Sequence, residues 1–156
     1  MNREQPIKMK IVLVGITEAG KSALITKYLR GQFSPVYEPT VLEITSGKKT
    51  IREQVYQLEV VDTNGDIGLN TNRAMQYRDA DLFIICCATD RHDSLAFVKD
   101  FVGEIRNEEH GKPIVLVQTK IDLENKANSD QIKVADLQHQ AMVHNLQRVL
   151  QTTCRQ

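Results

Sequence analysis

The segment GITEAGKS at residues 15–22 constrains the fold of this chain more than any other feature. It fits the pattern G-x-x-x-x-G-K-[ST] and directly follows residues 7–14, which begin with alternating polarity and become continuously apolar. Such a run is expected of a strand buried on both faces, and residues 21–29 then show a helical pattern. A glycine-rich turn between a buried strand and a helix predicts a phosphate-binding loop, and a coincidental turn without a ligand is the alternative.

The residue types in this segment suit phosphate. Gly15 and Gly20 allow the backbone to fold so that its N–H groups face phosphate oxygens, and the helix N-terminus adds partial positive charge. Lys21 can bridge the outer phosphates, and the Ser22 hydroxyl can ligate Mg²⁺. The residues expected to surround the nucleotide phosphates are Gly15, Thr17, Glu18, Ala19, Gly20, Lys21, Ser22 and Ala23.

The rest of the chain alternates between strand and helix patterns. Further strands are expected at residues 41–45, 54–61, 82–88, 113–118 and 147–152. Since a polar segment at 46–49 separates the first two runs, they predict a hairpin that turns there.

Three helices are expected between these strands. One is short and ends near Tyr77, one is amphipathic over residues 93–106, and one is capped by Ser129 or Asp130 and runs to about residue 145. Because strands alternate with helices, the chain predicts an α/β fold with a parallel sheet, to which the hairpin adds one antiparallel edge strand.

Length, charge and cysteine content narrow the class of protein. At 156 residues, the chain is expected to form a single domain, residues 1–156. With 20 basic and 20 acidic residues, it has no surplus of positive charge to bind nucleic acid. Its longest apolar run, residues 82–88, is too short to span a bilayer, and its start lacks a secretory signal. We therefore expect the protein to be located in the cytoplasm. Cys86, Cys87 and Cys154 do not have the spacing of a disulfide framework or a zinc site.

Three weaker motifs lie downstream of the phosphate loop. The sequence D-x-x-G, from Asp62 to Gly65, ends a predicted strand, where the carboxylate suits Mg²⁺ and the glycine N–H suits a γ-phosphate. Thr40, on the loop after the first helix, is placed to offer its hydroxyl to the metal. From Thr119 to Asp122, the chain follows a buried strand at its carboxyl end, where ligands bind in such sheets. The Asp122 carboxylate can accept two N–H bonds from guanine, which adenine does not supply.

In this order and spacing, the motifs resemble the small GTPases of the Ras superfamily over essentially the whole chain. The threonine of the guanine motif, the Tyr-x-Pro-Thr-Val loop and the Asp-Ser-Leu sequence at residues 93–95 look nearest to the Rho branch. The resemblance implies a three-layer P-loop G domain, with a mostly parallel six-stranded sheet and one antiparallel edge strand. It also implies that GTP and GDP bind with Mg²⁺.

The resemblance assigns roles around the phosphates and the metal. Lys21, Thr40 and Gly65 would sense the γ-phosphate. Mg²⁺ would be held by Ser22 and Thr40, with Asp62 beside it.

It also assigns roles around the base. Phe33 would pack against guanine, Lys120 would line it, and Asp122 would select it. Thr119 stands where the family often has asparagine, and the Cys154 backbone N–H would lie near guanine O6.

Two departures from the family pattern lie where hydrolysis is catalysed. The family has a glutamine after the D-x-x-G glycine to orient the attacking water, whereas this chain has Asp66, an anion near neutral pH. Thr17 and Glu18 add bulk and negative charge beside the phosphates, where an arginine finger would enter. These residues predict slow GTP hydrolysis that an ordinary activating protein does not rescue.

A third departure is the end of the sequence. The family's domain closes with a helix, which is missing from a chain that stops at Gln156, so an apolar patch is expected on one sheet face. We expect either a trimmed chain or a partner that covers this face. Cys154 is third from the end, so no C-a-a-X prenylation signal or other membrane anchor is visible.

Three functions compete on these residues. The first is a GTPase switch, whose effectors read the surface from Tyr37 to Glu43 and the region 62–77, with exchange factors as further partners. The second is a relative that binds GTP without hydrolysing it and acts as an interaction module, which Asp66 and Thr17 favour. The third, a P-loop kinase for a small molecule, would require an arginine-bearing lid that the sequence does not show.

Overall fold

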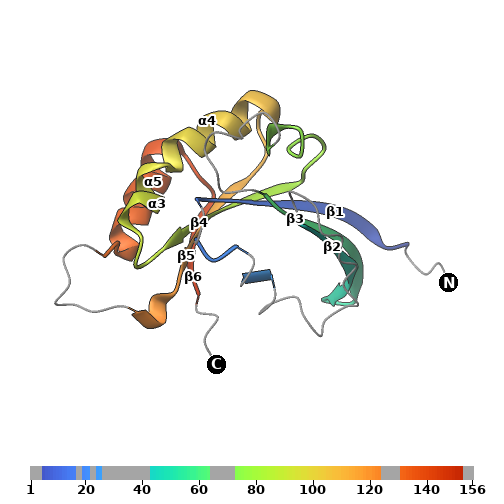
Figure 1. The fold of residues 1–156 in the computed structure, drawn as a ribbon. Helices are drawn as coiled ribbons and strands as arrows, with labels where there is room; N and C mark the ends of the chain where they lie inside the picture. Colours follow the sequence, from blue (N-terminus) through green and yellow to red (C-terminus); the bar gives the residue numbers. More distant parts are fainter. Residues whose placement is uncertain are drawn as a thin grey trace.

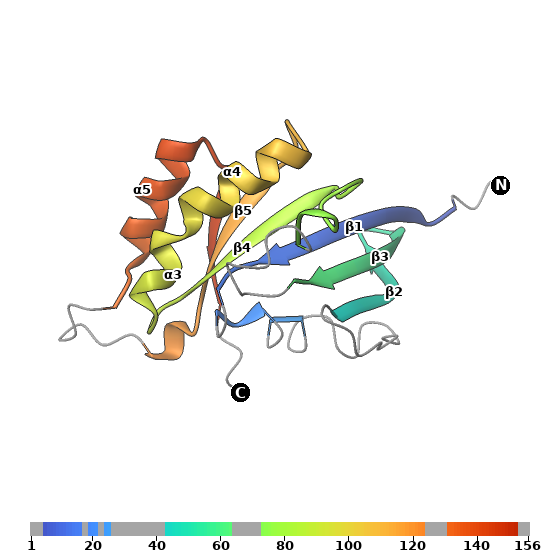
Figure 2. The same cartoon turned by 45° about the horizontal axis from the view of Figure 1, so that its top comes forward.

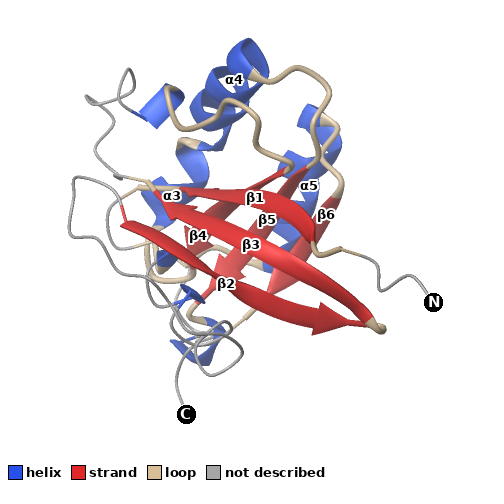
Figure 3. Cartoon of the chain, turned by 90° about the vertical axis from the view of Figure 1, so that its right-hand side faces the viewer, coloured by secondary structure: helices blue, strands red, loops and turns tan. Residues whose placement is uncertain are grey.

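A six-stranded sheet in the order β2-β3-β1-β4-β5-β6 forms the centre of the computed structural model (Figure 1), which describes residues 5–16, 19–21, 24–25, 43–63, 73–123 and 131–152. The strands are β1 (Ile7–Val14), β2 (Glu43–Ile51), β3 (Gln54–Asp62), β4 (Leu82–Ala88), β5 (Ile114–Thr119) and β6 (Arg148–Gln151). All neighbouring pairs are parallel except β2 and β3, which pair antiparallel at one edge (Figure 3). The predicted α/β class and its single antiparallel edge strand are therefore confirmed.

Three helices lie together on one face of the sheet (Figures 1 and 2). They are α3 (His92–Ala96), α4 (Val98–Glu108) and α5 (Val134–His144), and a 3-10 helix spans Ile121–Leu123 after β5. The strand register places Val12 beside Phe83 and Phe83 beside Ile114, so these three side chains share a face. They are at most 2% exposed and belong to one core cluster with Phe101 of α4 and Leu137 of α5.

The opposite face of the sheet carries apolar side chains that are partly exposed. By register, Ile84 of β4 shares this face with Val115 of β5, and both are only half-buried. Ile7 in β1 and Leu150 in β6 lie on the same face and are 47% and 46% exposed. Apolar side chains on this face are thus partly exposed at these four positions of the described strands.

The hairpin turn lies later in the chain than predicted. β2 continues through the polar residues 46–49, and Gly47 pairs with Leu58 inside the ladder. The chain turns instead at Arg52 and Glu53, whose φ angles of 49° and 68° are both left-handed. A two-residue turn with both φ angles positive matches the right-handed twist of the flanking strands. The prediction was wrong because it took the glycine as the turn, whereas two charged residues adopt the required backbone.

The predicted helix bounds also need correction. The helix expected at 93–106 is broken at Phe97, with φ −89° and ψ −1°, between α3 and α4. The break separates Ser94, whose hydroxyl accepts a 3.0 Å hydrogen bond from the Ala88 N–H, from the buried face of α4. The last helix begins at Val134, where the preceding Lys133 N–H donates to the Asp136 carboxylate at 2.8 Å. Ser129 and Asp130, the predicted caps, lie outside the described residues.

A buried ion pair anchors the segment before β4 to helix α4. Arg73 donates to both carboxylate oxygens of Glu104, at 2.8 and 3.0 Å, and the Tyr77 hydroxyl donates to the same carboxylate at 2.9 Å. The Arg73 guanidinium also lies 5.2 Å from the ring centre of Phe101. Burial and the neighbouring Glu104 carboxylate raise the pKa of Tyr77, so its hydroxyl remains a donor.

Candidate functional site

The carboxyl ends of β3, β1 and β5, with β4 between the last two, bring several predicted site residues to one edge of the sheet. Gly15 follows β1 directly, Asp62 ends β3 and Thr119 ends β5. The register pairs Leu13 with Asp62, and Ala88 with Thr119, so these strand ends lie level with one another. Ligands of parallel α/β sheets bind outside this edge.

The backbone of the phosphate loop requires glycine at two positions. Gly15 has a φ of +150°, and a Cβ there would lie 2.8 Å from the Cys86 carbonyl oxygen. Gly20 has a φ of +91°, and a Cβ there would lie 2.9 Å from the Thr119 hydroxyl oxygen. The loop therefore lies against β4 and β5 without room for larger residues, and its shape depends on both glycines.

Lys21 places a buried ammonium group inside the loop. Its Nζ donates to the carbonyl oxygens of Gly15 at 2.7 Å and Ile16 at 2.9 Å, and the residue is 7% exposed. Burial lowers the pKa of Lys21, an effect that the nearby Asp62 carboxylate opposes. A cation held in a ring of backbone groups at a helix start is suited to bind an anion.

Asp62 is buried beside this lysine. It is 6% exposed, and the next residue, Thr63, fixes the strand end by donating to the Leu13 carbonyl from its hydroxyl at 2.7 Å and from its N–H at 3.3 Å. Sequence reasoning assigned no role to Thr63, because its contact with β1 depends on strands being neighbours. A buried carboxylate at this point suits a cation bound near the phosphates.

The guanine motif joins the phosphate loop through Thr119. The Thr119 hydroxyl donates to the Ala19 carbonyl oxygen at 2.7 Å, and the residue is 1% exposed. Lys120 has a left-handed φ of 58°, and its Nζ lies 3.6 Å from an Asp90 carboxylate oxygen. Asp122 is exposed in the 3-10 helix that follows. The structure thus brings Thr119, the first residue of the predicted guanine motif, into contact with Ala19 of the predicted phosphate loop.

Two further residues at this edge were missed. Thr89 donates to the Thr119 carbonyl oxygen from its N–H at 3.1 Å and from its hydroxyl at 2.7 Å. Gln118, which is fully buried, donates to the Thr89 hydroxyl at 3.1 Å. The available signal was a glutamine inside an otherwise apolar strand pattern.

Several predicted site residues lie outside the described part of the chain. They are Thr17, Glu18, Ser22, Ala23, Phe33, Thr40, Gly65, Asp66 and Cys154. The proposed effector surface from Tyr37 to Glu43 lies outside it except for Glu43, and so do residues 64–72 of the second region.

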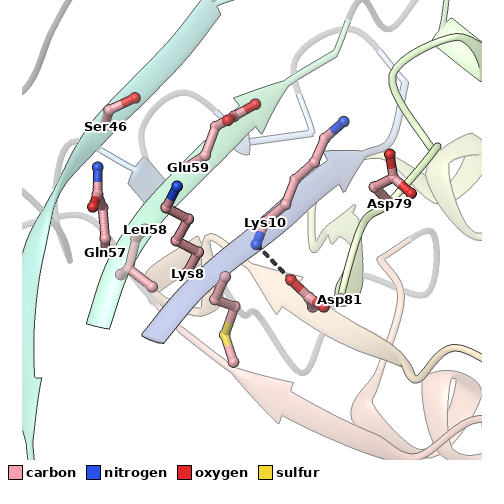
Figure 4. A pocket seen from close by; sticks show the side chains of 9 residues that line it. Lys8, Lys10, Ser46, Gln57, Leu58, Glu59, Asp79 and Asp81 are labelled. Atoms are coloured by element: carbon pink, nitrogen blue, oxygen red, sulfur yellow. Dashed lines mark hydrogen bonds between the residues drawn. The ribbon is translucent and has the colours of Figure 1, made fainter. Parts of the chain in front are cut away.

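A hollow elsewhere on the sheet does not coincide with the predicted site. It has a volume of about 350 Å³, and its lining includes Lys8, Lys10, Glu59 and Asp81 (Figure 4). The Lys10 N–H donates to the Asp81 carboxylate there at 2.8 Å. These residues lie in or next to the amino half of β1, away from the strand ends that carry the phosphate loop.

Metal-binding clusters and membrane-spanning helices are both absent from the described ranges. In those ranges, no three histidine, cysteine, aspartate or glutamate side chains are grouped as a metal site. Nor does any helix in them have the length and apolar character needed to cross a bilayer.

Comparison with known proteins finds one matching family and several similar GTP-binding proteins. The sequence model of the Ras family matches residues 10–154. "GTP-binding protein RHO3" of Saccharomyces cerevisiae is 35% identical over 143 residues, which cover 90% of this chain and 62% of that protein. "GTP-binding RHO-like protein" of Candida albicans is 35% identical over 137 residues, 86% of this chain and 40% of that protein.

"GTP-binding protein RHO1" of Saccharomyces cerevisiae is 34% identical over 120 residues, 76% of this chain and 57% of that protein. This chain therefore matches at most 62% of the length of these three relatives. Because the family match covers nearly the whole chain, the chain belongs to the Ras family, and it is similar to the Rho proteins named above.

Proposed function

We propose that this chain is a guanine-nucleotide switch that binds GTP and GDP with Mg²⁺ through a single G domain, residues 1–156, and hydrolyses GTP slowly. The observation that carries the proposal is the Thr119 hydroxyl bond to the Ala19 carbonyl, because it joins a phosphate loop to a guanine motif in one site. The Rho-type relatives, each named as a GTP-binding protein, support the same ligand.

The phosphates are proposed to bind in the loop around Lys21. Gly15 and Gly20 keep the loop backbone close to the strand ends, and the buried Lys21 ammonium provides the positive charge. The carbonyl groups of Gly15 and Ile16 hold this ammonium at the strand end. Phosphate oxygens are better partners for the ammonium than neutral carbonyls, because their negative charge adds Coulomb attraction to the hydrogen bond.

The chemistry of the donor set fits Mg²⁺. The proposed ligands are the hydroxyls of Ser22 and Thr40, with the Asp62 carboxylate nearby, and oxygen donors are what this ion prefers. The ion would neutralise charge on the phosphate oxygens. The burial of Asp62 next to Lys21 supports this role in the described part of the site.

Guanine selection is proposed for Asp122, with Lys120 along the base. Replacing Asp122 with alanine is expected to cost about 1.5–3 kcal/mol of guanine-nucleotide binding, the scale of hydrogen bonds to a charged group. Phe33 and the Cys154 N–H are proposed to complete the base pocket.

Slow hydrolysis is proposed from Asp66, since an anion is poorly suited to orient water against an anionic γ-phosphate. Thr17 and Glu18 are expected to hinder an arginine finger, which is worth about 10³–10⁵ in rate. Effectors and exchange factors would then set how long the protein stays in each state, and we expect it to work in the cytoplasm. The second candidate, a GTP-binding module that does not hydrolyse, is favoured by the same Asp66 and Thr17.

Single-turnover hydrolysis and nucleotide content separate these two candidates. The protein is purified, its bound nucleotide is identified by reversed-phase chromatography, and the analysis is repeated after incubation with Mg²⁺. Slow conversion of GTP to GDP supports the switch, whereas GTP that persists unchanged supports the module.

Substitution of Asp66 tests the reason given for slow turnover. Asp66→Gln is expected to speed hydrolysis about tenfold, because a neutral amide can both accept from water and donate to the phosphate. Asp66→Asn removes the charge with a shorter side chain and is expected to give a smaller gain. Hydrolysis by the unaltered protein as fast as that of an ordinary small GTPase would refute the proposal of slow turnover.

A further inference from the structure

Gln118 is a fully buried polar side chain near the end of β5, which lies between β4 and the edge strand β6. Its amide nitrogen donates to the Thr89 hydroxyl at 3.1 Å and to the Ile132 carbonyl at 3.3 Å. Its amide oxygen accepts a hydrogen bond from the Gln151 amide at 3.0 Å. One side chain thus links three separate segments: the turn after β4, the residues before α5, and β6.

These three segments surround the guanine motif. Thr89 holds the Thr119 carbonyl with two hydrogen bonds, at 2.7 and 3.1 Å. On the other side, the Thr152 N–H donates to the Gln118 carbonyl at 2.9 Å, and the Ile121 N–H donates to the Thr152 carbonyl at 3.3 Å. Both flanks of the segment from Thr119 to Ile121 are therefore tied to groups that Gln118 contacts.

An apolar side chain would be the ordinary choice at this buried position. A buried amide lowers stability unless its polar groups have partners, and here both amide hydrogens and the amide oxygen have one. Leucine there would remove the hydrogen bonds that Gln118 makes to the Ile132 carbonyl and the Gln151 amide. The contacts differ from simple core packing because they converge on the segments that frame the base-binding loop.

We propose that Gln118 is a positioning residue that fixes the guanine-selecting loop and thereby sets discrimination between purine bases. The inference rests on the proposed guanine recognition by Asp122, which lies four residues further along the chain. Gln118 does not touch the base. It holds Thr119 through Thr89, and so keeps the following carboxylate in register with the phosphate loop.

The test is the ratio of the dissociation constants for inosine diphosphate and guanosine diphosphate, measured with Mg²⁺ on folded protein. Inosine lacks the 2-amino group that a correctly placed carboxylate at residue 122 accepts, so the ratio reports the position of that carboxylate. Gln118→Leu is expected to reduce the ratio about fivefold, the factor that corresponds to one net hydrogen bond. Ile114→Val, in the core at the other end of β5, is the control that weakens packing and leaves the ratio unchanged.

A second pair of variants keeps the test decisive if Gln118→Leu does not fold. Thr89→Val removes the hydroxyl between Gln118 and Thr119, whereas Thr89→Ser retains it. The valine variant is expected to show a reduced ratio of the two dissociation constants. The serine variant is expected to keep the ratio of the unaltered protein.

The measurements distinguish a failure of guanine recognition by Asp122 from a failure of the positioning role of Gln118. If the unaltered protein binds the two nucleotides equally, guanine recognition by Asp122 fails, and this inference fails with it. If the unaltered protein discriminates and the Gln118 and Thr89 variants discriminate equally well, only the positioning role is refuted. A ratio that also falls in Ile114→Val would refute it too, because loss of stability alone would then explain the effect.

Discussion

The hydroxyl of Thr119 donates a 2.7 Å hydrogen bond to the carbonyl oxygen of Ala19, across 100 residues of sequence. It connects the strand end that carries the guanine motif with the loop proposed to hold phosphate. Because both groups are buried, the bond has no water to replace it when it is lost. This contact therefore links the segment proposed to recognise the base with the loop proposed to bind phosphate.

Thr119→Val is expected to speed the release of GDP about fivefold, since it removes this bond and leaves the Ala19 carbonyl unpaired by the side chain. Thr119→Ser keeps the hydroxyl and is the matched control. Release is followed with a fluorescent GDP analogue chased by excess GDP. Equal release rates for the valine variant and the unaltered protein would show that the contact does not support nucleotide binding.

Gly20→Ala is expected to abolish measurable GDP binding. The new methyl would lie 2.9 Å from the Thr119 hydroxyl oxygen at a backbone φ of +91°, so the loop must move away from β5. Gly111→Ala is the control, because it has a similar φ of +87° but nothing within 4 Å of the added Cβ. Calorimetric titration with GDP measures both variants, and full binding by Gly20→Ala would contradict the proposed fit of loop to strand.

How far the sequence predicts this structure depends on whether the signal is local. The phosphate loop was recognisable because Gly15, Gly20 and Lys21 stand at a fixed spacing after a buried strand. The hairpin turn at Arg52 and Glu53 was not recognisable from the sequence, because neither residue type favours a left-handed backbone. The register of β2 against β3 determines where the turn lies.

Contacts between distant segments were out of reach for the same reason. The roles of Gln118 and Thr89 depend on which strands are neighbours and on where α5 begins. Helix α5 begins at Val134, after the Lys133 N–H that donates to the Asp136 carboxylate. This start lies later in the chain than the predicted caps Ser129 and Asp130. Residue patterns indicate elements, whereas the polar contacts between elements depend on the assembled sheet.

Glu104→Gln is expected to lower the free energy of unfolding by about 2 kcal/mol, because it replaces the carboxylate that accepts hydrogen bonds from the Arg73 guanidinium, 1% exposed, with a neutral amide. Arg91→Gln is the control, since its ion pair with Asp93 is exposed and should contribute no more than about 0.5 kcal/mol. Urea unfolding followed by circular dichroism gives both values. Equal effects from the two variants would refute a structural role for the buried pair.

The double variant Arg73→Met with Glu104→Met sharpens this test. Replacing a buried ion pair by apolar residues is often close to neutral, so the double variant is expected to be more stable than the sum of its single variants predicts. Strict additivity would mean that the two residues act independently.

Stability is expected to fall as pH drops below about 6.5, partly because of His144. Burial, followed by the charges of Arg106 and Lys99, lowers the pKa of His144 in the folded chain. The unfolded chain therefore holds the proton to higher pH, and protonation below that value favours unfolding. Thermal melts between pH 7.5 and 5 should show a smaller loss of stability for His144→Gln than for the unaltered protein. The control His110→Gln, at an exposed position, should lose as much stability as the unaltered protein. An unchanged slope in His144→Gln would contradict the assignment.

The most direct measurement of the central claim is a competition titration, in which unlabelled GDP and ADP displace a fluorescent GDP analogue from the purified protein in the presence of Mg²⁺. The account predicts that GDP displaces the analogue at a concentration at least about tenfold lower than ADP, the scale of the hydrogen bonds proposed for Asp122. Equal displacement by both nucleotides, or no binding of the analogue at all, would contradict it.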